Sequence, residues 1–301
     1  MRIKLIDVDG VRTRYIHAGT GYPLILLHGV GVSADTFLRN VDALGRDFAV
    51  YAPDMLGHGF TDSVDYAGGP PQPHIVAHLG SFADALGLER YCVAGSSFGA
   101  LIAALMYFDR PARVDGLVLI GSGSTFHPPE EQAEVLKAVF ANASKALGDP
   151  TLESCRQRLA NIVHDPATVP EEMLLVQLTS YALPDRFDAY KATIKGMADS
   201  VASDVHRVYT RLDKLDLPCL VITGRQDIRS SIEFTEAGCR VMPDAELHVF
   251  EDCNHMPYIE HPEKFNALVA SFVGRVAAAG PAADSTESTE STELREATAA
   301  P

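Results

Sequence analysis

The sequence contains no tryptophan, and it has few cysteines and few basic residues for its length. Its five cysteines lack any C-x-x-C spacing, so they indicate neither a zinc motif nor a redox pair. Only 25 lysines and arginines oppose 40 acidic residues, for a net charge of -15 over 301 residues. Nucleic acid and anionic membranes would repel such a chain, so we expect neither as a partner.

Long apolar runs and a secretory start are also missing. The longest mostly apolar stretch, residues 94–108, is shorter than the roughly 18 residues that indicate a membrane span. Residues 1–9 alternate like a strand and carry Arg2, Lys4 and Asp7, unlike a signal peptide. We therefore expect a cytoplasmic protein that acts on a small molecule.

What the chain does contain is an alternation of compact apolar runs and helical patterns. Runs rich in Val, Ile and Leu and bounded by Gly, Pro or Asp are typical of strands buried on both faces. The expected strands cover 3–7, 13–18, 24–27, 48–52, 91–94, 114–120, 217–222 and 246–250. The expected helices cover 34–44, 74–86, 98–108, 232–241 and 262–276. This order predicts an α/β fold with a mostly parallel, doubly wound sheet.

Two segments depart from the alternation. Residues 124–204 have helical composition and no convincing strand, and they predict a helical cap inserted between core parts 1–123 and 205–279. Residues 280–301 repeat the triplet STE three times and hold almost nothing apolar. We expect this acidic tail to be disordered.

The strongest local motif is the run Gly95-Ser96-Ser97-Phe98-Gly99, which fits G-x-S-x-G. It falls between an expected strand and an expected helix, where a sharp turn would present Ser97 in a strained conformation. The flanking glycines fit such a turn because a side chain there would collide with the neighbouring strand and helix. Ser97 is therefore the candidate nucleophile.

A catalytic serine needs a nearby base and a third group that orients this base. The expected strand 217–222 is followed by Asp227, and the strand 246–250 is followed by His255. The carboxyl ends of parallel strands share one edge, so both residues are expected near Ser97. We predict a catalytic triad with Ser97 as nucleophile, His255 as general base and Asp227 as the acid.

Other residues near the triad receive simpler interpretations. Asp252 competes for the role of the acid, but it lies three residues before His255 on the same short loop and could hardly reach the far imidazole nitrogen. Cys253 is expected to be a buried thiol. His58 is expected to support its loop, because one base is already supplied.

The run Leu-His-Gly-Val-Gly at 27–31 follows the first core strand, and its glycines free the backbone to point an amide into the site. The predicted oxyanion hole consists of the backbone N–H groups of Val30 and Phe98, the latter aided by its helix dipole. His28 is expected to be structural rather than catalytic.

Over residues 3–276 the sequence resembles the α/β-hydrolase superfamily, through the HGVG, PDMLGHGFTD, GSSFG, GRQD and CNHMPYIEHPEKF segments. Within it, the DMLGHGFTD segment, the cap and the C-terminal segment are similar to carbon-carbon bond hydrolases that act on meta-cleavage products of aromatic degradation. The resemblance implies an α/β-hydrolase fold, no metal, no organic cofactor, a substrate held between core and cap, and a homodimer.

The chain departs from those hydrolases at four places. They carry an HGxGPG loop, an asparagine before the nucleophile, a cap arginine that grips the substrate carboxylate and a tryptophan after the catalytic histidine. Here the loop continues as Val30-Gly31-Val32-Ser33, and the other places hold Ser96, Gln177 and Met256. By position, substrate contacts are assigned to His28, Gly29, Ser96, Gln177 and Met256.

These observations favour a serine hydrolase and leave its substrate open. One hypothesis is cleavage of a carbon-carbon bond in a meta-cleavage-type vinylogous diketone, and the other is a carboxylesterase or lactonase acting on a small hydrophobic ester. Cofactor-free lyase or oxygenase chemistry on the same scaffold, and a non-catalytic binding protein, remain as different classes. A product that contains no oxygen from water would identify a lyase or oxygenase. A binding protein need not show the rise with pH, near the pKa of a histidine, that a catalytic imidazole gives to activity.

Overall fold

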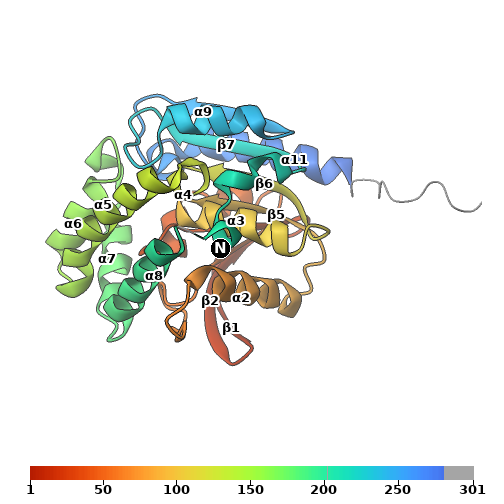
Figure 1. Cartoon of the computed structure of the whole chain (residues 1–301). Coiled ribbons are helices and arrows are strands. Elements are labelled where there is room, and N and C mark those ends of the chain that lie inside the picture. The colour runs from red at the N-terminus through yellow and green to blue at the C-terminus, as the bar shows by residue number, and fades with distance from the viewer. Residues whose placement is uncertain (202, 281–301) are drawn as a thin grey trace, which may run out of the picture.

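A computed structural model describes residues 1–201 and 203–280. This part of the chain forms an eight-stranded sheet in the order β1-β2-β4-β3-β5-β6-β7-β8 (Figure 1). The first two pairings, β1 with β2 and β2 with β4, are antiparallel, and all the others are parallel. The strands are β1 (Arg2–Val8), β2 (Val11–Ala18), β3 (Pro23–Leu27), β4 (Ala49–Pro53), β5 (Tyr91–Ser96), β6 (Val114–Ile120), β7 (Cys219–Gly224) and β8 (Ala245–Phe250).

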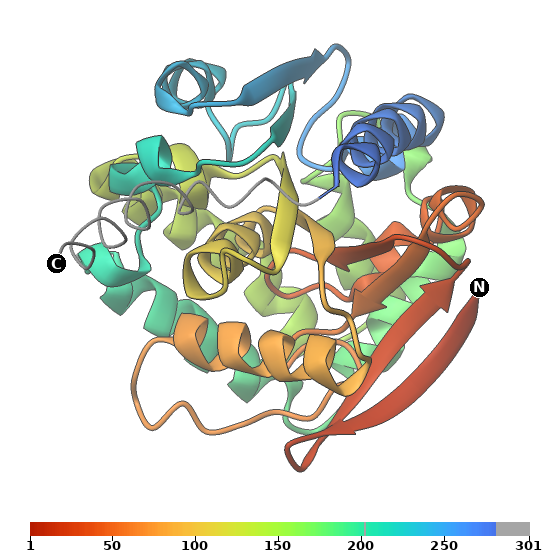
Figure 2. The same cartoon turned by 90° about the vertical axis from the view of Figure 1, so that its right-hand side faces the viewer.

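Helices cover both faces of the sheet. Helices α2, α3 and α9 lie on one face, and α1 and α11 lie on the other (Figure 2). The central strands β3, β5, β6 and β7 are almost entirely buried between these layers, which explains their continuous apolar sequences. These core helices are α1 (Val41–Leu44), α2 (Pro71–Ala85), α3 (Phe98–Asp109), α9 (Ile232–Val241), α10 (Pro257–Glu260) and α11 (Pro262–Ala279).

The segment between β6 and β7 is helical, with no strand among its described residues. It contains α4 (Gly123–Phe126), α5 (Pro129–Gly148), α6 (Leu152–Ala160), α7 (Glu171–Tyr181) and α8 (Arg186–Ser200), with 3-10 turns at Pro166–Thr168, Asp204–His206 and Tyr209–Lys214. Helices α5 to α8 group together at one side of the sheet (Figure 1), and we call them the cap.

The expected helix over 34–44 is wrong as a single element. The structure instead has a 3-10 turn, Ala34–Phe37, followed by the short helix α1. Between them, the side chain of Asn40 donates hydrogen bonds to the carbonyl of Tyr258 and to the side chain of Asn266. These bonds tie the break to α10 and α11, so tertiary contacts override the helical pattern.

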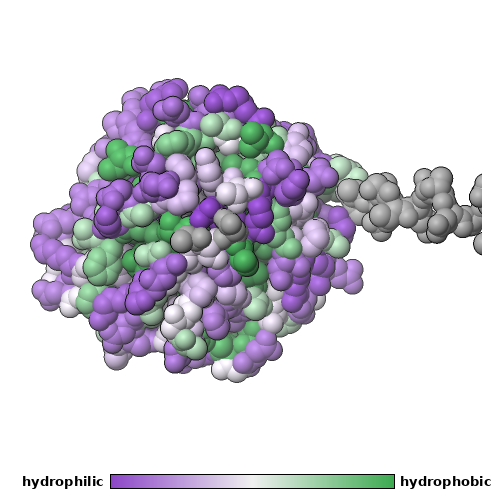
Figure 3. Space-filling model, viewed as in Figure 1, coloured by the Kyte–Doolittle hydropathy of each residue, from purple (hydrophilic) through white to green (hydrophobic). Residues whose placement is uncertain are grey.

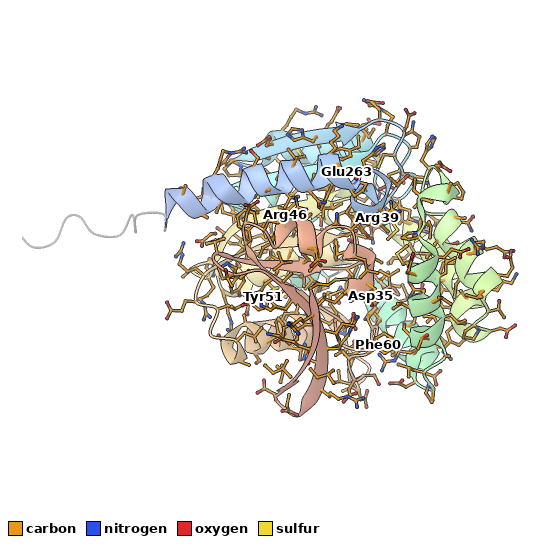
Figure 4. All side chains as sticks on the ribbon, turned by 180° about the vertical axis from the view of Figure 1, so that it is seen from behind. Asp35, Arg39, Arg46, Tyr51, Phe60 and Glu263 are labelled. Atoms are coloured by element: carbon orange, nitrogen blue, oxygen red, sulfur yellow. The ribbon has the colours of Figure 1, made fainter. Side chains whose placement is uncertain are left out.

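A buried ion cluster holds the loops that follow β3 and β4. Arg14 on β2 donates to both carboxylate oxygens of Asp35, at 2.6 and 2.7 Å, and also contacts Asp54. Asp54 in turn accepts from the backbone N–H groups of Ala34 and Phe60. Figure 4, seen from behind, places Asp35 near Phe60. The glycine-rich loop after β3 is thereby anchored at its far end.

The face of the molecule drawn in Figure 3 is mainly hydrophilic, with hydrophobic residues in small groups rather than in one broad patch. Within the described residues, no helix combines the length and hydrophobicity needed to cross a membrane. Apart from Gly280, the acidic tail expected over 280–301 lies outside the described residues.

Candidate active site

Ser97 stands at the turn between β5 and α3 with φ 54° and ψ -116°. Such a positive φ is strained for any residue other than glycine. The flanking glycines permit this turn: a Cβ on Gly95 would lie 2.2 Å from the carbonyl oxygen of Gly99, and one on Gly99 would lie 2.4 Å from that of Leu27. The G-x-S-x-G spacing is therefore a steric requirement of this backbone.

His255 and Asp227 form a hydrogen-bonded pair with almost no solvent exposure. Nδ1 of His255 lies 2.8 Å from Oδ2 of Asp227, and Oδ1 of Asp227 accepts the backbone N–H of Arg229 at 2.8 Å. An ionised carboxylate only accepts hydrogen bonds, so Nδ1 carries the proton. Nε2 is left with its lone pair, as a general base requires.

Close backbone approaches bring the loops of this pair together. A Cβ on Gly224, at the end of β7, would lie 2.0 Å from the carbonyl oxygen of Asn254, so the loops after β7 and β8 touch there. Gly121, just after β6, has φ +51°, and its Cβ would lie 3.1 Å from Oδ2 of Asp227. The carboxyl ends of three neighbouring strands thus converge on His255.

Glu260 supports the histidine loop from α10, and sequence reasoning missed it. Its carboxylate accepts the backbone N–H groups of Asn254 and Met256, on either side of His255, at 2.9 and 3.3 Å. It also accepts the N–H of His164 at 2.5 Å, which links the loop to the cap. An acidic residue closing the otherwise apolar run Pro257–Glu260 was the only signal in the sequence.

Ser97 and His255 line one cavity, together with the candidate residues Gly29, Val30, Ser96 and Met256. A second cavity adjoins it, is lined by Ser97, Val30 and Phe98, and extends beneath α5 of the cap. Among the described hydrogen bonds, none joins the side chains of Ser97 and His255.

Two backbone N–H groups beside Ser97 have no partner within the described residues, those of Val30 and Phe98. Phe98 is the first residue of α3, where an amide lacks an intrahelical acceptor and feels the positive end of the helix dipole. A Cβ on Gly29 would lie 3.4 Å from that of Ser97, so the loop after β3 passes directly against the serine. Both amides could stabilise an oxyanion.

Two of the predicted substrate contacts lie outside these cavities. His28 is fully buried, with Nδ1 donating to the carbonyl of Gly29 and Nε2 accepting the N–H of Met55. Gln177 is buried in α7, and its side-chain amide nitrogen has no partner among the described residues. Neither lines the two cavities next to Ser97.

The competing acid, Asp252, sits at a positive φ of 49°, and none of the described hydrogen bonds joins its side chain to His255. Cys253 is a free, buried thiol, and burial raises its pKa above the usual range, as expected for a structural cysteine. Within the described residues, no group of three His, Cys, Asp or Glu side chains is placed to hold a metal ion.

His28 and His58 make stability depend on pH. Burial lowers the pKa of His28 to about 4 and that of His58 to about 3. As pH falls below about 6.5, these histidines bind protons in the unfolded chain but not in the folded chain. Each histidine therefore lowers the free energy of unfolding by about 2 kcal/mol between pH 8 and pH 5.

Urea unfolding of wild type and His58→Asn at pH 8 and pH 5 checks this expectation. The asparagine amide nitrogen, like Nδ1 of the histidine, is bonded to Cγ and can still donate to the carbonyl of Leu56, but it does not titrate. The variant should lose about 2 kcal/mol less than wild type on acidification. An identical loss in both proteins would show that His58 is protonated in the folded state.

The order of the strands and the elbow after β5 place this fold among the α/β-hydrolases, and its helical cap stands between β6 and β7. Residues 24–268 match the model of the Alpha/beta hydrolase family, and the chain belongs to that family. The chain is thus an α/β-hydrolase by fold, by family and by the hydrolase names of its relatives.

Several relatives carry names from meta-cleavage pathways. A 2-hydroxy-6-oxononadienedioate/2-hydroxy-6-oxononatrienedioate hydrolase of Burkholderia vietnamiensis is 33% identical, over 89% of this chain and 93% of that protein. A 2-hydroxymuconate semialdehyde hydrolase of Pseudomonas putida is 29% identical, over 89% of this chain and 93% of its own length. The meta-cleavage product hydrolase CumD of Pseudomonas fluorescens superposes with a TM-score of 0.74 at 28% identity, covering 90% of this chain and 97% of that structure.

Proposed function

We propose that the chain is a serine hydrolase with a triad of Ser97, His255 and Asp227, and that it cleaves a carbon-carbon bond in a meta-cleavage-type vinylogous diketone. The observation that carries the proposal is the buried hydrogen bond between His255 and Asp227, because His255 lines the same cavity as the strained Ser97. The meta-cleavage hydrolases among the relatives support the choice of bond.

In the proposed reaction, the enol hydroxyl of the substrate first gives up its proton while a ring-derived carbon is protonated, which yields a second ketone. Ser97 then adds to the remaining carbonyl, with its proton passing to Nε2 of His255. The N–H groups of Val30 and Phe98 stabilise the oxyanion. Breaking the carbon-carbon bond leaves an acyl group on Ser97 and a carbanion that the new ketone stabilises, and the proton held on Nε2 of His255 passes to this carbon. The neutral imidazole then takes a proton from water, whose oxygen adds to the acyl group, and the proton returns to Ser97 as the acid leaves.

His255 and the oxyanion hole would also serve a variant of this route. Nε2 of His255 can take a proton from a water molecule instead, and the hydroxide then adds to the same carbonyl without an acyl-enzyme. Both routes consume one water and give the same two products. Both need the base and the oxyanion hole, and they differ in whether Ser97 forms a covalent bond.

Two optical substrates test the proposal. We expect purified protein to bleach a yellow meta-cleavage dienoate rapidly and to cleave a short nitrophenyl ester slowly, with both rates depending on Ser97. The dienoate loses its colour only if the conjugated chain is cut or rearranged, so product analysis for the released acid completes the measurement. Fast ester cleavage with an untouched dienoate would instead establish a carboxylesterase or lactonase.

A further inference from the structure

Two arginines line the cavity that holds Ser97 and His255, and neither has a carboxylate partner among the described residues. Arg158 comes from α6 of the cap, and Arg229 comes from the loop after β7. Within residues 1–201 and 203–280, no ion pair involves either side chain. Two unpaired cations beside the candidate nucleophile contrast with the net charge of -15 of the whole chain.

Arg158 is held rigidly although its charge is not neutralised. Its helix begins with a reciprocal capping box between Thr151 and Ser154. The side chain is 95% buried, lies 5.2 Å from the centre of the Tyr181 ring, and donates to the carbonyls of Gly31 at 2.6 Å and Val30 at 3.4 Å. Nε has no partner. Backbone carbonyls carry only partial charge, and a buried cation is ordinarily paired with an anion.

Arg229 is half-buried and reaches both cavities next to Ser97. Its side chain forms no hydrogen bond within the described residues. The carboxylate whose charge acts on it, that of Asp227, accepts the N–H groups of His255 and of the Arg229 backbone. Burial, together with the charge of Arg229, lowers the pKa of Arg158 to about 10. Both guanidinium groups therefore remain charged at neutral pH while repelling each other.

We propose that Arg158 and Arg229 bind a carboxylate of the substrate in the cavity beside Ser97, so that the enzyme selects an acid over a neutral ester or amide. The inference rests on the proposed function, because it concerns the same cavity. A carboxylate in this cavity would supply the counter-charge that both side chains lack within the described residues, and it would relieve the repulsion between the two cations. Neither arginine stands at the position of Gln177, where the family resemblance places the carboxylate-gripping residue.

Binding without turnover tests the subsite directly. In a Ser97→Ala background, calorimetry compares hexa-2,4-dienoate with the neutral and nearly isosteric hexa-2,4-dienamide. We expect the acid to bind about 10- to 100-fold more tightly, the range of a charge-assisted hydrogen bond. Arg158→Met and Arg229→Gln should each reduce this preference to a few-fold. Equal affinities, undetectable binding of the dienoate, or a preference that survives both substitutions would overturn the proposal.

Arg156→Met is the matched control, since Arg156 lies on the same helix but is exposed and contacts Glu171 at 3.5 Å. It should leave the preference unchanged. Arg229→Gln guards against a folding failure of the Arg158 variant, because the Arg229 side chain has no hydrogen bonds to lose in the described structure. Thermal unfolding of each variant verifies that it is folded.

A second measurement separates carboxylate binding from mere support of the loop at Val30. If Arg158 only held that loop, Arg158→Met would lower kcat equally for a meta-cleavage dienoate and for its methyl ester. A carboxylate subsite predicts that KM rises for the acid and changes little for the methyl ester. If the arginine variants lose the acid preference but the wild-type protein cleaves no dienoate, the carboxylate subsite is supported and the proposed function is refuted. If the wild-type protein cleaves the dienoate efficiently without any acid preference, the proposed function is supported and the subsite is refuted.

Discussion

Replacing Ser97 with alanine is expected to lower kcat for the dienoate and the nitrophenyl ester by about a thousandfold or more. The alanine removes the hydroxyl that we propose adds to the carbonyl but leaves the amides of Val30 and Phe98 in place. The fold should tolerate the change, because alanine fits the same turn and no hydrogen bond of the Ser97 side chain is found in the described structure. Stopped-flow turnover and the thermal unfolding midpoint measure the two effects.

Ser96 provides the matched control for this substitution. Its hydroxyl donates to Tyr258 at 3.2 Å, and it lines the same cavity. Ser96→Ala should therefore shift turnover by less than about tenfold, the scale of one neutral hydrogen bond. If Ser97→Ala retained activity comparable to Ser96→Ala, Ser97 would have no part in the mechanism, and a histidine-activated water would remain as the nucleophile.

The parts of the fold that could be predicted from the sequence are those whose signals are local. The strand expected over 114–120 and the helix expected over 232–241 match β6 and α9, because a buried strand and an amphipathic helix each impose their own periodicity. The elbow at Ser97 follows from two glycines that steric contact requires. Asp227 and His255 could be placed on the loops after β7 and β8 because each lies only a few residues beyond the end of an expected strand.

The features that could not be predicted depend on contacts between distant segments. Asn40 breaks an apparent helix because its amide bonds to α10 and α11, more than two hundred residues away in the sequence. Arg158 belongs to a short helix with a polar sequence, so nothing local distinguishes it from the exposed Arg156 two residues earlier. Only the docking of the cap against the loop after β3 shows that one arginine is buried at the site.

The loop after β3 connects the two proposed halves of the site. The carbonyl of Val30 accepts from Arg158, while the N–H of the same residue, beside Ser97, has no acceptor among the described residues. A carboxylate that attracts Arg158 would change the hydrogen bonds from Arg158 to the carbonyls of Val30 and Gly31, and these peptide groups orient the oxyanion hole. Binding of an acid and stabilisation of the oxyanion are therefore expected to be coupled, and substitutions at Arg158 should affect oxyanion stabilisation more than those at Arg229 do.

Replacing Asp227 with asparagine is expected to reduce turnover by about ten-thousandfold with little change in geometry. The asparagine oxygen can still accept the backbone N–H of Arg229, which directs the amide nitrogen toward Nδ1 of His255. Nδ1 must then accept, so the ring proton moves to Nε2, where it blocks transfer from the serine. The imidazolium that forms during reaction also loses its counter-charge. Turnover and the chemical shifts of the His255 ring protons report both consequences.

Asp252→Asn is the appropriate control, because Asp252 lies on the loop of His255 and its positive φ of 49° is one that asparagine tolerates. It removes the same charge from the same neighbourhood without touching Nδ1, so turnover should stay within a few-fold of wild type. Near-normal rates for Asp227→Asn combined with a collapse for Asp252→Asn would transfer the acid's role to Asp252. The buried 2.8 Å contact between Asp227 and His255 would then be structural, and the loop of Asp252 would have to rearrange on substrate binding.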